Sequence, residues 1–199
     1  MFVEILGLGH PRSGTKYTSK LCELWGLEVG HEAIKKHGTV AWLLTKQTGP
    51  YMWMRTISKR PEYNHLVYNT RDPLTALPSV VYTENTNSDS FNFRKSFIVI
   101  NSNNPIENAI DSIVGFHNII MDLKPNVVFK IETEQKKLFD YLSKHYDIKY
   151  IEHIEKENTR QHKSFEDMIQ QYGIPSKYHI EKINKYCKDC GYNEIKFEV

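Results

Sequence analysis

The first apolar run of the chain predicts a buried strand followed by a helix. Residues 2–8, FVEILGL, are almost continuously apolar, which is typical of a strand covered on both faces. Apolar residues between positions 17 and 25 then recur at helical spacing, so a helix should begin near Gly14 and end at Gly26. The chain therefore opens with a strand, a short loop and a helix.

Strands and helices should alternate along the rest of the chain. Further strands are expected at 27–32 (LEVGHE), 65–70 (HLVYNT), 126–132 (NVVFKIE) and 148–154 (IKYIEHI). Helices are expected at 38–47, from Pro73 onward, at 106–120, at 134–146 and over most of 164–190. Such alternation predicts an α/β fold, a three-layer sandwich whose central parallel sheet of about five strands has helices on both faces. No repeat or linker is visible, so we expect a single domain over residues 1–199.

Composition narrows the class of protein. Hydrophobic residues make up 40% and charged residues 25% of the 199 residues, which suits one globular core. A formal net charge of +2 is too small to indicate a nucleic-acid or membrane partner, so any basic site must be local. The first apolar run contains Glu4 and has no basic region before it, unlike a signal peptide. Together with only three cysteines, this predicts a cytoplasmic protein with reduced thiols.

Two of the cysteines, Cys187 and Cys190, form a C-x-x-C pair. A zinc site would need a second pair or histidines at ligand spacing, and the sequence offers neither. We therefore expect two thiols at a helix end, before Gly191, and no metal site.

The loop after the first strand reads GHPRSGTKYTS, residues 9–19. Gly9 and Gly14 have the spacing of a nucleotide-triphosphatase phosphate loop, G-x-x-x-x-G-K-[ST]. Here Thr15 precedes Lys16, however, and Tyr17 stands where the magnesium-binding hydroxyl should be. The loop should therefore hold a phosphate whose charge is balanced by protein cations. The alternative is a plain strand-to-helix turn with exposed basic residues.

An anion site at this loop follows from its chemistry. Glycines let the backbone approach an anion, and the N–H groups and dipole of the following helix favour negative charge. Arg12, Ser13, Thr15 and Lys16 add donors or positive charge.

A second candidate lies in RDPLTALPS, residues 71–79. Asp72 and Pro73 predict a helix start, because the carboxylate caps the helix and proline suits its first turn. Arg71 would project from the preceding strand end, where a guanidinium can grip a phosphate in bidentate fashion. Ser79 would add a hydroxyl bond about two turns into the helix. Together with the glycine-rich loop, this suggests two phosphate sites for one ligand.

These residues resemble the 3′-phosphoadenosine 5′-phosphosulfate (PAPS)-dependent sulfotransferases. Their 5′-phosphosulfate loop reads P-[KR]-S-G-T, as do residues 11–15, and their 3′-phosphate motif is an Arg with a Ser eight residues later, as at Arg71 and Ser79. VGHEAIKKHGTVAW and KIE, residues 130–132, resemble segments of the microbial and phage members. The similarity covers roughly the first two-thirds of the chain. The resemblance implies a P-loop nucleotide-binding fold.

The implied reaction moves a sulfonate group in line from PAPS to a hydroxyl or amine, without metal, and releases adenosine 3′,5′-bisphosphate. The acceptor would be a small molecule or a carbohydrate. Arg12 and Lys16 would stabilise charge, with Lys16 the proton source. Members of the family use a His or a Glu after the second strand as the base, which points to His31 or Glu32, with Glu32 favoured. The ligand-binding set is Pro11, Arg12, Ser13, Gly14, Thr15, Lys16, Tyr17, Arg71, Ser79 and Arg160.

The chain departs from the family in its C-terminal part. The G-x-x-G-x-x-K signature of the cytosolic animal enzymes is absent, so Arg160 or Lys163 would have to cover the 3′-phosphate. Pro78 should disturb the helix next to Ser79. Two other readings stay open, a nucleotide or small-molecule kinase with a degenerate loop and a non-catalytic nucleotide-binding protein.

Overall fold

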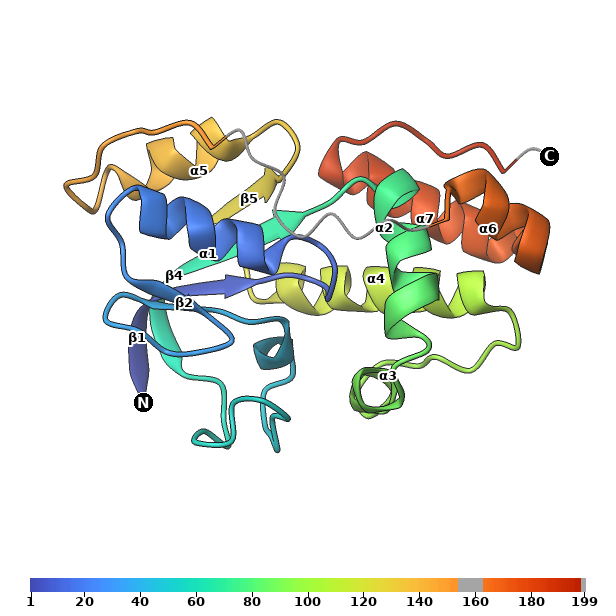
Figure 1. Ribbon diagram of the computed structural model, residues 1–199, viewed down its shortest axis with the longest axis horizontal. Coiled ribbons are helices and arrows are strands. Elements are labelled where there is room, and N and C mark those ends of the chain that lie inside the picture. The colour runs from blue at the N-terminus through green and yellow to red at the C-terminus, as the bar shows by residue number, and fades with distance from the viewer. Residues whose placement is uncertain (154–162, 198–199) are drawn as a thin grey trace. The chain divides into compact units, whose positions relative to one another are not determined.

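A computed structural model of the chain describes residues 1–153 and 163–197 (Figure 1). Its centre is a five-stranded sheet in the order β2-β3-β1-β4-β5, and every neighbouring pair is parallel. The strands are β1 Phe2–Leu8, β2 Val29–His31, β3 Gly38–Val40, β4 Glu62–Thr70 and β5 Val127–Lys130. The predicted fold class, an α/β sandwich around a central parallel sheet, is confirmed.

Contacts divide the chain into two compact units. The first consists of Met1–Thr70 and Ile119–Thr159, and it contains the whole sheet. The second consists of Arg71–Asn118 and Arg160–Val199 and is helical in its described part. The boundary at Asn118 falls within a helix, and the expectation of a single domain stays a prediction.

Two helices pack on one face of the sheet in the first unit. These are α1 Thr15–Leu24 and α5 Gln135–Leu142, drawn on the same side of the strands in Figure 1. Leu21 of α1 and Leu138 of α5 are fully buried in one core with Ile5 of β1. The residues that alternate with Ile5 along β1, such as Leu6, are fully buried as well. The near-continuous apolar sequence of β1 is thus that of an inner strand.

Two predicted elements of this unit are wrong. Residues 38–47, expected as a helix, form β3 and then a 3₁₀ turn, Trp42–Thr45. Residues 148–153 form no strand, and Trp25 Nε1 donates to the carbonyl of Ile151 at 2.9 Å. The tryptophan side chain thus bonds a carbonyl group that would otherwise have paired with a neighbouring strand. The sheet still has five strands, because β3 is one that the sequence did not predict.

The second unit contains α2 Pro73–Ser79, a π-helical turn Val80–Glu84, α3 Ser88–Lys95, α6 Phe165–Tyr172 and α7 Lys177–Cys190, as well as most of α4 Pro105–Asp122. Leu77, Ile110 and Ile183, from α2, α4 and α7, are each fully buried in one core. The amphipathic spacing of α4 is the reason that this helix was predicted correctly.

The start of α2 is as predicted, because Asp72 Oδ1 accepts a hydrogen bond of 2.9 Å from the backbone N–H of Leu74. Pro78 lies inside the helix, and the α-helical pattern ends at Ser79, where the π-helical turn begins. Proline cannot donate the regular hydrogen bond, so a local change of helix type next to it is the physical consequence.

A fully buried arginine links parts of the second unit. Arg94 donates to the Glu84 carbonyl at 2.8 Å and to Ser112 Oγ at 2.8 Å, and further to the Ser90 carbonyl and Asn85 Oδ1. Burial lowers the pKa of Arg94 to about 10, against the opposing effect of Glu84.

Among the described residues, none of the helices is long and apolar enough to cross a bilayer.

Candidate functional site

The candidate site of the first unit lies where its parallel strands end. The loop 9–14 follows β1. His31 is the last residue of β2, and Glu32 comes directly after it. Asn69 and Thr70 are the last two residues of β4. The carboxyl ends of parallel strands meet at one edge of a sheet, which is where α/β proteins bind ligands. The structure thus brings the predicted loop and both base candidates to the same edge.

The loop between β1 and α1 has an unusual backbone. Arg12 has a φ of 74° and Gly14 a φ of 92°, both left-handed, and the Ser13 N–H donates to the His10 carbonyl at 2.9 Å. A left-handed conformation at a non-glycine residue such as Arg12 costs roughly 1–2 kcal/mol. Non-glycine strain of this kind concentrates at functional sites.

Gly9 is required by close contacts. A Cβ atom at this position would lie 2.5 Å from Ser13 Oγ and 2.7 Å from Asn69 Nδ2. These distances are far below van der Waals contact, so any side chain at position 9 would push the loop out of place. The glycine spacing that resembles a phosphate loop therefore has a steric basis in this chain.

At the first turn of α1, no capping side chain and no acidic side chain of the helix competes with a ligand for the backbone N–H groups. Gly14 is the N-cap residue and makes no side-chain capping bond, and no acidic residue occupies the first turn. The first N–H groups of a helix have no partner within the helix, and its dipole favours a negative charge there. Thr18 Oγ1 donates to the Gly14 carbonyl at 3.1 Å, which fixes the backbone behind the loop.

The structure adds a residue that the sequence did not reveal, Asn69. Its Nδ2 donates to the Ser13 carbonyl and to Ser13 Oγ, at 2.8 Å each. Asn69 is fully buried and Ser13 nearly so. An asparagine in the buried second half of β4, just before the strand ends, was the signal that could have found it.

The two base candidates have different surroundings. His31 is half-buried, and its Nε2 lies 3.2 Å from Thr15 Oγ1. Burial lowers the pKa of His31, and the nearby charge of Lys16 lowers it further. Glu32 is also half-buried, with a left-handed φ of 52°, and its N–H donates to the Val40 carbonyl at 3.0 Å.

Two further residues of the predicted set belong to the start of α1. Lys16 and Tyr17 are both half-buried. The Tyr17 ring stacks on that of His153, with centroids 5.4 Å apart. Burial raises the pKa of Tyr17, and Tyr150, Glu132 and Glu152 raise it further. Tyr17 is thus a neutral, packed ring where a triphosphatase has its magnesium-binding hydroxyl. Pro11, of the same loop, is buried.

The predicted 3′-phosphate residues belong to the second unit. Arg71 is half-buried, and its Nε donates to Thr75 Oγ1 at 3.0 Å. Ser79 is fully buried, and its carbonyl accepts a hydrogen bond from Thr83 Oγ1. Arg160 lies outside the described residues. Lys163, the other candidate, is exposed and donates to Gln171 Oε1 at 2.9 Å.

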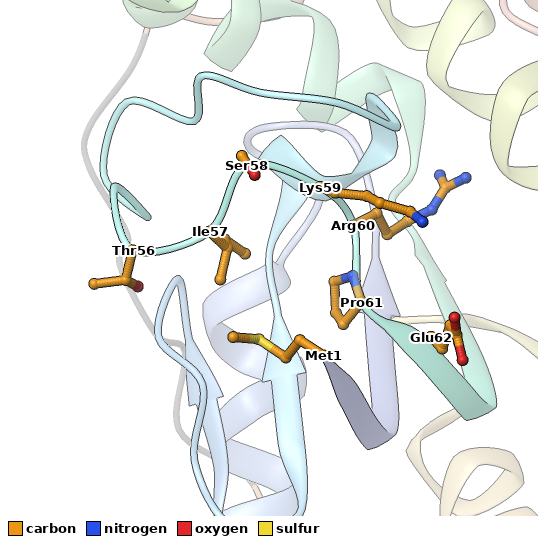
Figure 2. Close-up of a pocket in the computed structure, with 8 residues that line it drawn as sticks. All are labelled: Met1, Thr56, Ile57, Ser58, Lys59, Arg60, Pro61 and Glu62. Atoms are coloured by element: carbon orange, nitrogen blue, oxygen red, sulfur yellow. The ribbon is translucent and has the colours of Figure 1, made fainter.

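A pocket of about 220 Å³ lies at the other end of the sheet. Figure 2 shows that it is lined by Met1 and by the segment 56–62, next to the amino ends of β1 and β4. It is therefore distinct from the candidate site at the carboxyl edge.

Within the described part of the chain, no cluster of three or more His, Cys, Asp or Glu side chains could hold a metal ion. Cys187 and Cys190 form no disulfide and lie in the last turn of α7, before Gly191, as expected.

Comparisons with known proteins identify no relative of this chain. A scan against protein-family models and searches of curated proteins and of solved structures find no match to this chain.

Proposed function

We propose that the protein is a PAPS-dependent sulfotransferase that moves a sulfonate group to a hydroxyl or amine of a small molecule or carbohydrate. The proposal rests on the resemblance of its two phosphate motifs to those of that family. The observation that carries it is the loop 9–14, whose glycines, left-handed Arg12 and uncapped helix start suit an anion.

The residues fit a phosphosulfate better than a magnesium-bound triphosphate. Arg12 and Lys16 supply positive charge beside the backbone N–H groups of the first turn of α1, while the ring of Tyr17 is packed against His153. In the proposed P-loop fold, these groups take over the charge balance that magnesium provides in a triphosphatase.

In the reaction, the acceptor oxygen or nitrogen attacks sulfur in line, the bond from sulfur to the bridging oxygen breaks, and adenosine 3′,5′-bisphosphate leaves. Negative charge develops on the bridging oxygen, where Arg12 and Lys16 stabilise it. Arg12 keeps its proton at all relevant pH values, so Lys16 is the group that can donate one. Positioning supplies the remaining acceleration.

The acceptor loses its proton to a base in this scheme. Glu32 is our first candidate and His31 the second, both at the end of β2. The lowered pKa of His31 favours its neutral imidazole, which is the form that can accept a proton.

Arg71 and Ser79 are proposed to contact the 3′-phosphate, by analogy with the family motif. The Arg71 guanidinium is half-buried and suits this role. Full burial of Ser79 restricts its hydroxyl, so we assign the larger part of this contact to Arg71.

A thermal-shift experiment tests the ligand class. Adenosine 3′,5′-bisphosphate with EDTA should raise the melting temperature, as expected for a ligand that binds only the folded chain. Stabilisation by ATP with magnesium alone would favour a kinase instead. A screen of candidate acceptors with radiolabelled sulfate donor then tests transfer, and binding without transfer to any acceptor would favour a non-catalytic nucleotide-binding protein.

A further inference from the structure

We propose that Asn69 is a positioning residue that turns the hydroxyl hydrogen of Ser13 toward the ligand. The loop would then select a fully deprotonated phosphate or sulfate group at this point. The identity of the ligand rests on the proposed function, whereas the role of Asn69 in the loop does not.

The direction of the amide follows from the groups around it. The Ser13 carbonyl can only accept a hydrogen bond, so the group facing it at 2.8 Å is the NH₂ of Asn69. The same nitrogen lies 2.8 Å from Ser13 Oγ. Both hydrogens of the amide are therefore directed at one residue, and Ser13 Oγ is the acceptor of the second bond.

The direction of the Ser13 hydroxyl follows in turn. A serine hydroxyl has one hydrogen and two lone pairs, and here Asn69 engages one lone pair. The hydrogen cannot point along the same line, so it is left to donate elsewhere. An ionised phosphate or sulfate oxygen only accepts hydrogen bonds, which makes it a suitable partner, whereas a ligand group that must donate would be disfavoured.

Burial makes this arrangement rigid. Asn69 is 0% exposed and Ser13 6% exposed, so water cannot easily replace either bond. Gly9 leaves the space that the amide needs, because a Cβ there would lie 2.7 Å from Asn69 Nδ2. Asn69 Oδ1 is buried and has no hydrogen-bond partner among the described residues. The two hydrogen bonds to Ser13 thus hold this side chain, while its Oδ1 atom is left without one. Buried polar atoms are nearly always hydrogen-bonded, so this exception calls for a functional reason.

Asn69→Asp tests the proposal with almost no change of shape. An ionised carboxylate only accepts, so the Ser13 hydroxyl would turn toward it and away from the ligand, and the Ser13 carbonyl would face a negative charge. Asn64→Asp is the matched control, because Asn64 is an exposed residue near the other end of β4 whose Nδ2 donates to Glu4 Oε2. Both variants add the same charge to the same strand.

The first readout is affinity for adenosine 3′,5′-bisphosphate by calorimetry. Asn69→Asp should weaken binding at least tenfold, and Asn64→Asp should leave it within about twofold. In addition, the losses caused by Ser13→Ala and Asn69→Ala should be less than additive in the double variant, because one residue acts through the other. Additive losses, or unchanged affinity of Asn69→Asp, would overturn the proposal.

The second readout needs no ligand and separates the two proposals. Amide hydrogen exchange over residues 9–18 should become faster in Asn69→Asp and stay as in the wild type in Asn64→Asp. If the wild type binds no bisphosphate but this exchange pattern holds, the proposed function fails and the role of Asn69 stands. Unchanged exchange refutes the role itself. Should Asn69→Asp not fold, Asn69→Ala is read in the same way.

Discussion

His31 Nε2 lies 3.2 Å from Thr15 Oγ1, so the end of β2 is tied to the first residue of α1. This contact joins the proposed base region directly to the anion loop. The imidazole also feels the positive charge of Lys16, which lowers its pKa together with burial. Charge at the loop and protonation at the end of β2 are therefore coupled.

We expect the free energy of unfolding to fall as the pH drops below about 6.5. The folded-state pKa of His31 is lower than its ordinary value of 6.5, mainly because of burial. Below pH 6.5 His31 is therefore protonated more in the unfolded chain than in the folded one. This difference lowers the free energy of unfolding as the pH falls. His31→Asn should flatten the dependence, measured by urea unfolding between pH 5 and 7.5.

Two other histidines contribute in the same direction, because burial also lowers the pKa of His65 and His117. The single variant should therefore reduce the slope without removing it. NMR titration isolates His31: in Lys16→Ala its pKa should rise, since the repelling charge is gone. An unchanged His31 titration in that variant would contradict the coupling.

Glu32→Gln should reduce kcat by about 10²–10⁴-fold, the usual contribution of a general base. The substitution keeps the size of the side chain, so the melting temperature should change little. The assay is sulfonate transfer to whichever acceptor the screen identifies.

His31→Asn, measured in parallel, decides between the two candidates. A larger loss of kcat in His31→Asn than in Glu32→Gln would move the role of base to the histidine. Full activity of both variants would show that neither side chain is the base.

Gly9→Ala should destabilise the protein by about 1–3 kcal/mol, as overpacking of a tight site does. The new methyl group would overlap Ser13 Oγ and Asn69 Nδ2. Because Ser13 belongs to the loop and Asn69 donates hydrogen bonds to it, bisphosphate affinity should fall as well. Urea unfolding and calorimetry give the two quantities.

Gly26→Ala is the control for this substitution. Gly26 has a φ of 92°, but a Cβ there would meet no atom within 4 Å. It should cost roughly 1–2 kcal/mol of stability through its left-handed backbone and leave ligand affinity unchanged. Equal effects of both variants on affinity would argue against a specific role for Gly9.

Arg94→Lys should destabilise the second unit by about 1–3 kcal/mol despite the conserved charge. The planar guanidinium reaches Glu84, Ser112 and two further acceptors, and an ammonium group cannot reproduce this fork. Buried acceptors would lose their donor. Chemical unfolding measures the change, with Lys95→Arg on the exposed neighbouring residue as control. Equal stability of both variants would contradict this prediction.

Much of the fold could be predicted because its strong patterns are local. The apolar run of β1 and the Asp72–Pro73 start of α2 each contain their own signal. The strand β3 has only three residues, Gly38–Val40, and is stabilised by pairing with β1 and β2, which no local pattern shows. Residues 148–153 have strand-like alternation because Tyr150 packs on Trp25 and Phe139, without forming a ladder.

The site was predictable only as far as its motif is contiguous. The loop 9–14 and the pair His31–Glu32 follow directly from strand ends. Asn69 joins the loop through a contact between residues 56 positions apart, so only the folded chain shows it. The left-handed backbone of Arg12 and Glu32 was equally hidden, because neither residue type favours it.

The late position of β5 in the chain has a consequence for biosynthesis. β4 pairs with β1 on one edge and with β5 on the other, yet β5 begins only at Val127, after most of the second unit has been translated. Until that segment leaves the ribosome, the buried second half of β4, Val67–Thr70, has an edge with unpaired N–H and C=O groups, a template for aggregation. The nascent polypeptide is therefore most open to wrong strand pairing during the interval between translation of its fourth and fifth strands.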